Sequence, residues 1–140
     1  MNADHIATID KNDQEQIRIS LLKTNKVDIR TYFAFPDSKE HKPTRKGVML
    51  LPKHTHPILS AMDKFAKNGD ENIHLEFFLS VKEKLRAYTS EYRNKKLFHI
   101  RVFYNKEGEF KPGKGISFPV TLAPKIHAAL KTAGVKQKAA

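Results

Sequence analysis

The 140-residue sequence has no cysteine and no tryptophan, and it has far fewer acidic than basic residues. Without cysteine there is no disulfide framework, no thiolate metal site and no cysteine nucleophile. The longest apolar stretches are much shorter than the ~20 residues that a membrane-spanning helix needs. The segment from Met1 to Ile6 lacks the basic and apolar regions of an export signal. We therefore expect an intracellular protein without a membrane segment.

The basic surplus is large and uneven. Lysine and arginine number 26 against 15 aspartates and glutamates, a formal net charge of +11. Residues 1–70 carry 12 basic and 9 acidic residues, whereas residues 71–140 carry 14 and 6. This surplus favours a polyanionic partner, and the nine phenylalanines and four tyrosines offer rings on which unpaired bases stack. The alternative is a soluble basic protein whose aromatic residues all lie in the core.

Two segments of the chain recur about 70 residues further on. Residues 28–33 (DIRTYF) resemble residues 99–104 (HIRVFY), and residues 42–48 (KPTRKGV) resemble residues 111–116 (KPGKGI). A proline and an apolar helical pattern follow in each copy. Two copies of this length predict a duplicated domain instead of a solenoid. We expect the first repeat to span residues 5–70 and the second residues 71–135.

Each repeat has the pattern of four strands followed by a helix, which predicts an α+β fold. Alternation and β-branched or aromatic content predict strands at residues 5–10, 16–22, 27–35 and 48–51, and at residues 73–79, 85–92, 97–104 and 116–120. For the helices we expect caps at Thr55 and Thr121, first-turn prolines at Pro57 and Pro124, and ends at Asn68-Gly69 and Gly134. The tail from Val135 to Ala140 is expected to be frayed.

The long strand of each repeat carries an arginine two residues before an aromatic ring. Period-two alternation puts Arg101 and Phe103 on one face and Tyr104 on the other, so only a bulge or a strong twist brings Arg101 and Tyr104 to one ligand. In the first repeat Arg30 and Tyr32 share a face. Such a pair is a plausible stacking platform for bases. The alternative is a cross-strand cation–π pair without a ligand.

Basic residues also recur in the turns next to these strands. They lie at the hairpin before the long strand and in the loop before the last strand, at Lys23, Lys26, Arg93, Lys95 and Lys96, and at Lys42, Arg45, Lys46, Lys111 and Lys114. If the loops converge on one edge of a sheet, they line a path for phosphates. If they do not, they are solvated surface charges.

Patterns typical of an enzyme are missing. His54 and His56 flank Thr55, but they have no third metal ligand at a useful spacing, and the segment is better interpreted as the start of a helix. The glycines form no dinucleotide or phosphate-loop fingerprint. No nucleophile–base pair is visible, so we expect no catalysis, no cofactor and no metal.

Residues 85–116 resemble the C-terminal domain of the positive cofactor four transcriptional coactivators. The resemblance depends on a strand that ends at Tyr92, the basic turn 93–95, the strand containing Ile100-Arg101, and the element KPGKGIS at residues 111–117. The first repeat matches through Ile29-Arg30 and through KPTRKG at residues 42–47. The resemblance implies a curved four-stranded antiparallel sheet with one helix, which binds single-stranded DNA as a dimer. Two repeats in one chain then imply an intrachain pseudo-dimer, with the monomer as the binding unit.

The resemblance also implies roles for residues. In the second repeat Tyr92 and either Phe103 or Tyr104 would stack on bases, and Arg93, Lys95, Arg101 and Lys114 would hold phosphates. The counterparts in the first repeat are Tyr32 or Phe33, with Arg30, Lys23, Lys26, Arg45 and Lys46. The chain departs from the family in having Tyr104 and Phe33 where the family has tryptophan, and no ring in the first repeat matches Tyr92.

The expected function is therefore sequence-tolerant binding of single-stranded DNA, including melted duplex, in transcription or replication. One alternative is an RNA-binding protein of the Whirly or Pur-alpha type. Another is an interaction module that recruits RNA polymerase or another transcription protein, or a virion protein.

Overall fold

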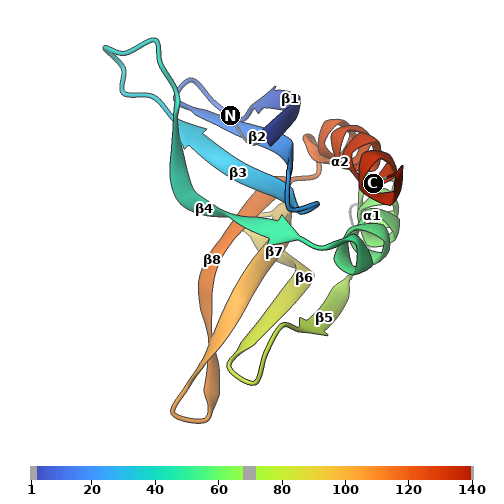
Figure 1. Cartoon of the computed structure of the whole chain (residues 1–140). Coiled ribbons are helices and arrows are strands. Elements are labelled where there is room, and N and C mark those ends of the chain that lie inside the picture. Colours follow the sequence, from blue (N-terminus) through green and yellow to red (C-terminus); the bar gives the residue numbers. More distant parts are fainter. Residues whose placement is uncertain (1–2, 68–71, 140) are drawn as a thin grey trace.

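The structure, a computed structural model, describes residues 3–67 and 72–139. It contains two four-stranded antiparallel sheets, each followed by a helix, which confirms the predicted α+β layout of two repeats (Figure 1). The first repeat comprises β1 (Ala3–Asp10), β2 (Glu15–Leu22), β3 (Val27–Phe33), β4 (Lys42–Leu50) and α1 (Pro52–Lys67). The second comprises β5 (His74–Phe78), β6 (Glu83–Tyr92), β7 (Lys95–Lys106), β8 (Glu109–Pro119) and α2 (Ala123–Ala139).

Within each sheet the strands are antiparallel neighbours in chain order. Short turns join most of these partners, and a longer loop over residues 34–41 joins β3 to β4. The predicted alternation is visible in the burial of side chains. Ile17, Ile19 and Ile29 point into the core from the first sheet, and Phe98 and Ile100 do so from the second. The residues between them form the other face of each sheet, called here the outer face.

Each helix covers the sheet of the other repeat. Helix α2 packs on β1, β2 and β3 of the first sheet (Figure 1). Helix α1 packs on the second sheet, where Phe65 lies with its ring centroid 5.4 Å from Phe98 and His54 lies 5.0 Å from Phe77. The two helices also pack on each other, and β4 packs beside β8. The inner faces of both sheets and both helices therefore share one hydrophobic core.

The start of α1 differs from the prediction. The helix begins at Pro52, so Thr55 is not its cap and Pro57 lies in the second turn instead of the first. Proline suits a first helical position, and Pro52 occupies that position. The hydroxyl of Thr55 donates instead to Gln137 Oε1 at 2.8 Å. The predicted end of this helix at residues 68–69 lies outside the described residues.

The end of α2 also differs from the prediction. The helix continues through Gly134 to Ala139, so Gly134 does not end it and the tail over residues 135–139 is not frayed. Gly134 lies where α2 crosses α1, and a Cβ there would be 3.1 Å from Thr55 Cγ2. The glycine thus allows a close helix crossing. At the start of α2, Pro124 lies in the first turn as predicted, but the helix begins at Ala123, two residues after Thr121.

A buried glutamine fixes the end of α2. Gln137 Nε2 donates to the backbone oxygens of Asn25 and Leu50 at 3.0 and 2.9 Å, and Gln137 Oε1 accepts from Thr55. Lys136 adds an ion pair with Asp4 at 3.2 Å. The helix of the second repeat is therefore hydrogen-bonded to the β2–β3 turn, to β4 and to α1.

Strands β4 and β8 are much longer than the predicted strands at 48–51 and 116–120. Their first halves contain the polar elements KPTRKG and KPGKG, whose proline and glycines argue against a strand. Both elements nevertheless pair with the preceding strand, because each contains a bulge that accommodates the additional residues.

Candidate nucleic-acid interface

The repeated sequence elements KPTRKG and KPGKG each form a bulge, the first in β4 and the second in β8. In the first repeat Arg30 pairs with Gly47 and Tyr32 pairs with Pro43, so residues 44–46 lie opposite the single residue Thr31. In the second repeat residues 113–114 lie opposite Val102. The bulge residues Arg45, Lys46 and Lys114 are exposed.

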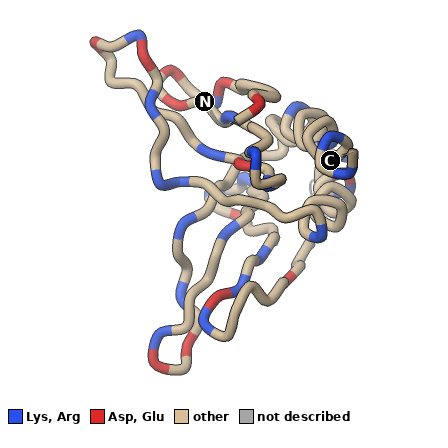
Figure 2. Tube along the Cα trace, viewed as in Figure 1, with Lys and Arg blue, Asp and Glu red and all other residues tan. Residues whose placement is uncertain are grey.

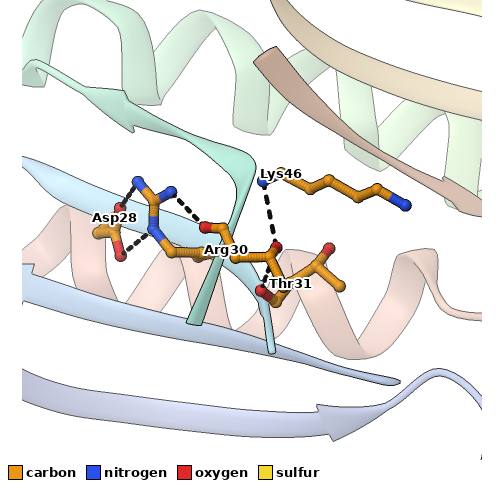
Figure 3. A network of polar contacts seen from close by, with 5 residues as sticks. Asp28, Arg30, Thr31 and Lys46 are labelled. Carbon is orange, nitrogen blue, oxygen red and sulfur yellow. Dashed lines mark hydrogen bonds and ion pairs between the residues drawn. The ribbon is translucent and has the colours of Figure 1, made fainter. Parts of the chain in front are cut away.

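An arginine side chain reaches into each bulge. Arg30 Nη1 donates to the carbonyl oxygen of Thr44 at 2.9 Å, and Arg101 Nη1 donates to that of Gly113 at 2.8 Å (Figure 3 shows the first repeat). The arginine stem crosses the glycine on the next strand. A Cβ on Gly115 would lie 2.7 Å from Cα, Cβ and Cγ of Arg101. The arginine side chain therefore has room in each repeat only because the facing residue, Gly47 or Gly115, has no side chain.

A basic cavity of about 300 Å³ lies where the two bulges approach each other between β4 and β8. Its charged lining residues come from both repeats and are Lys11, Arg45, Lys46, Arg101 and Lys114. Among the described residues that line it, none is acidic. Figure 2 shows basic positions along both strands in this region. Five cations around one cavity, with the backbone of Gly113 and Gly115 beside them, form an environment that favours an anion such as phosphate.

The outer face of the second sheet carries a run of aromatic and cationic side chains next to this cavity. The rings of Tyr88 and His99 are stacked with centroids 4.7 Å apart, and Tyr88 meets Phe103 edge-on at 6.0 Å. The guanidinium of Arg86 lies 4.4 Å from the Phe103 centroid. Arg101 borders both this run and the cavity.

The outer face of the first sheet is simpler. Arg18 covers the ring of Tyr32 at 4.2 Å, the same cross-strand arrangement as Arg86 over Phe103. In place of the Tyr88–His99 pair, this sheet has the register pair Ser20 and Asp28. The two outer faces therefore share one cation–π pair but differ in their other rings.

The predicted site residues thus fall into separate places. The cavity brings together Arg45, Lys46, Arg101 and Lys114, and β-strand alternation puts Tyr92 and Lys95 on the outer face with Phe103.

Tyr104 and Phe33 lie on the opposite face. The bulge foreseen near Arg101 exists, but it is in β8, so β7 keeps its alternation. Tyr104 nevertheless lies near Gly113, since a Cβ on that glycine would be 3.3 Å from the Tyr104 ring. Arg101 and Tyr104 therefore meet the same residue from two faces of the strand.

The remaining predicted cations lie away from the cavity. Lys23 and Lys26 flank the β2–β3 turn, and Arg93 and Lys95 flank the β6–β7 turn, at the ends of β3 and β7 that are distant from the bulges. The side chain of Lys111 pairs with Glu109 at 2.9 Å. The β6–β7 ribbon extends three residue pairs further than its counterpart, so Tyr92 has no equivalent in the first sheet.

Sequence reasoning missed the contribution of the second strand in each sheet. Arg18 and Arg86 cover the rings that were assigned to Arg30 and Arg101, and Tyr88 supplies a ring on the outer face. A signal was available, because Arg18 and Arg86 are 68 residues apart, the same offset as Gly47 and Gly115. Lys11, from the β1–β2 turn, carried no signal because the matching position of the second repeat, Leu79, is not basic.

Burial and neighbouring charges change the ionisation of three groups. Burial, with a smaller contribution from the charge of Arg101, lowers the pKa of His99. Hydrogen bonds from Arg86 and Lys84 lower the pKa of Glu76, an exposed residue next to the aromatic run. Burial, and then the charge of Lys53, lower the pKa of His54.

His54 lies buried at the start of α1. Its Nδ1 accepts a hydrogen bond from the backbone N–H of Leu51 at 3.2 Å, and its ring packs on Phe77. In residues 3–67 and 72–139 there is no group of three or more histidines and carboxylates that could hold a metal. Over the same residues, neither helix is long and apolar enough to cross a membrane.

Comparison with known proteins agrees with the resemblance of the second repeat. Residues 79–129 match the family described as Transcriptional Coactivator p15 (PC4). Among solved structures, the chain is similar to a PC4 homologue from Burkholderia pseudomallei, with 22% identity over 46% of this chain and 90% of that chain and a TM-score of 0.39. No curated protein matches the chain. The matched family is thus the one that the sequence led us to expect for the second repeat, over residues 79–129.

Proposed function

We propose that this protein binds single-stranded DNA with little sequence preference, because residues 79–129 match the PC4 family of nucleic-acid-binding transcriptional coactivators. It would act on melted DNA in transcription or replication, and not as an enzyme. The observation that carries the proposal is the position of the five-cation cavity beside the aromatic outer face of the second sheet.

The two parts of this surface suit the two parts of a single strand. The cavity offers cations for the phosphates, whose counterions are released on binding. On the outer face of the second sheet the partly exposed rings of Tyr88 and His99 offer planar surfaces for unpaired bases, whereas Phe103 is buried with 9% of its surface exposed. Stacking of this kind tolerates any base. Arg101 borders both parts, so a phosphate and the base next to it are bound close together. In a duplex the bases are already stacked and paired, which leaves only the phosphate contribution.

The chain acts in this proposal as a monomeric pseudo-dimer. The cavity takes Arg45 and Lys46 from the first repeat and Arg101 and Lys114 from the second, so one chain already combines both bulges. The binding unit is therefore a single chain. Light scattering of the complex should give one protein per short oligonucleotide, whereas a dimer whose dissociation abolishes binding would contradict this part.

Fluorescence anisotropy with a labelled oligothymidine, at several salt concentrations, tests the proposal. If ~4–6 phosphates are contacted, the logarithm of affinity falls with the logarithm of salt with a slope of about −3 to −4. Lys114→Gln should flatten the slope by about 0.7. The matched control is Lys125→Gln, which removes the same charge from an exposed position on α2. Equal binding of blunt duplex, or equal effects of the two variants, would refute the proposed surface.

A matched RNA oligonucleotide separates DNA from RNA binding. The protein is a DNA-binding protein if oligothymidine binds more tightly than oligouridine of the same length. The reverse order would support the RNA-binding alternative, which uses the same cations and rings.

A second candidate function is recruitment of a transcription protein, and one observation favours it. The tip of the β5–β6 hairpin exposes Phe78, Leu79 and Val81, with 70%, 40% and 91% of their surfaces accessible. Exposed apolar side chains that gather at one tip are typical of a protein-binding site. Val81→Ser should weaken capture of RNA polymerase from nuclease-treated extract without changing binding to oligothymidine.

A further inference from the structure

We propose that the residue two places before the repeated arginine decides which outer face binds single-stranded DNA. Asp28 weakens binding by the outer face of the first sheet, and His99 allows binding by that of the second. This inference depends on the proposed single-strand binding. It adds that the second repeat contributes more to the affinity than the first. It is carried by the contacts of the two arginines and by the rings around them.

In the first repeat Asp28 forms an ion pair with the guanidinium of Arg30. Asp28 Oδ1 accepts from Arg30 Nη2 at 2.9 Å and Asp28 Oδ2 accepts from Arg30 Nε at 3.3 Å (Figure 3). The third contact of this guanidinium is the Thr44 carbonyl in the bulge. Only 17% of the arginine side chain and 14% of the aspartate side chain are exposed. The pair carries no net charge. A phosphate that approached Arg30 would therefore also meet the carboxylate of Asp28.

In the second repeat the same position has no carboxylate. His99 pairs in register with Tyr88, as Asp28 does with Ser20. Within the described part of the chain, Arg101 forms no ion pair, and its one side-chain hydrogen bond is to the Gly113 carbonyl. Arg101 lines the basic cavity, and its counterpart Arg30 is not among the cavity's lining residues. In contrast to Arg30, Arg101 therefore presents a positive charge that no carboxylate of the described residues pairs with, and further N–H donors, next to the cavity.

The histidine also changes the aromatic content of the face. His99 stacks on Tyr88 with an angle of 16° between the rings, and a 2.6 Å hydrogen bond joins its Nε2 to the hydroxyl of Ser90. Tyr88 in turn meets Phe103, so three rings follow one another across the second face. At the matching positions the first face has Ser20, Asp28 and Tyr32, of which only Tyr32 is a ring. Stacking thus favours the second face, and so does the charge of Arg101, which is unpaired among the described residues. This holds even though Glu76 forms ion pairs with Lys84 and Arg86 on that face.

The test exchanges the two residues and uses oligothymidine anisotropy as a function of salt. Asp28→Asn should raise affinity about 3–10-fold at low salt and steepen the salt slope by about 0.7, since one more phosphate is held. His99→Asp should lower affinity by a similar factor and flatten the slope by about 0.7. The controls are Asp63→Asn and Ser60→Asp, which make the same charge changes on α1, away from both outer faces.

The outcomes separate the possible failures. If wild type binds oligothymidine but Asp28→Asn behaves like Asp63→Asn, the inference is wrong and the proposed function stands. If wild type does not bind, both are wrong. Thermal melting checks that each variant is folded. Should His99→Asp unfold, Asp28→Asn decides the question alone, because asparagine keeps a hydrogen-bond acceptor for Arg30 and removes only the charge.

Discussion

Replacing Gln137 by alanine tests whether the end of α2 holds the two repeats together. The side chain is buried, with 2% of its surface exposed, and it bonds to the backbone of Asn25 and Leu50 and to the hydroxyl of Thr55. A frayed tail would make all of these contacts irrelevant to stability. The observed contacts instead predict a large loss.

The magnitude follows from what the substitution leaves behind. The Leu50 carbonyl loses its donor in a buried place, which costs about 1–3 kcal/mol. The Asn25 carbonyl lies at a turn and loses a bond of about 1 kcal/mol, because water replaces the donor. The Thr55 hydroxyl keeps the carbonyl of Leu51 as an alternative acceptor at 3.2 Å, so it adds little. We expect a loss of about 3 kcal/mol, or a melting temperature lower by about 10 °C for a protein of this size.

Urea denaturation and thermal melting, both followed by circular dichroism, measure this loss. The control is Lys138→Ala, one residue further along α2 and exposed. It should change the free energy of unfolding by less than about 0.5 kcal/mol, as is usual for surface substitutions. If Gln137→Ala and Lys138→Ala unfold at the same urea concentration, residues 135–139 do not contribute to the folded state, and the reasoning fails.

Three further predictions follow from the site and the core. Gly115→Ala should lower the free energy of unfolding by about 1–3 kcal/mol and weaken oligothymidine binding, because the new methyl group displaces the Arg101 stem; unchanged urea curves would contradict the close approach. The double variant Arg101→Ala with Tyr92→Ala should weaken single-strand binding more than Arg30→Ala with Tyr32→Ala, provided that melting curves show both folded; equal losses would mean that the two halves bind alike. Burial lowers the pKa of His54 and His99 below their ordinary value of 6.5, so the unfolded chain takes up protons that the folded chain does not. The free energy of unfolding should therefore be highest above about pH 6.5 and fall as the pH is lowered through and below that value, and His99→Gln should make this fall shallower in urea titrations.

The sequence predicts most of the sheet architecture, because each sheet has one buried face. Alternating Ile17, Ile19 and Ile29 indicate the strands, and their β-branched side chains suit a pleated surface. The internal repeat gives the layout of two similar units and the two recurring segments that contain Arg101 and Gly115. These features are local in the sequence, so local patterns reveal them.

What the sequence does not predict depends on contacts between distant segments. Gly134 resembles a helix stop, and only the crossing with α1 near Thr55 explains a glycine inside α2. The cavity joins Lys11, Arg45 and Lys114, which no pattern of spacing connects. The exchange of helices between sheets also escaped prediction, since the apolar stripe of α1 fits either sheet equally well. The local sequence thus predicts that α1 and α2 are helices, but only the tertiary structure shows which sheet each helix covers.

The exchange of the two helices affects how the chain is made. As the protein is synthesised, β1 to β4 and α1 are complete before α2 exists, and α2 is the helix that covers β1, β2 and β3. Ile17, Ile19 and Ile29 therefore stay uncovered on the ribosome until the strands of the second repeat and α2 have been translated. Folding of the whole molecule is then a late, concerted event. A crowded solution of unfinished or refolding chains offers each first sheet an α2 from another molecule, which is the route to domain-swapped assemblies.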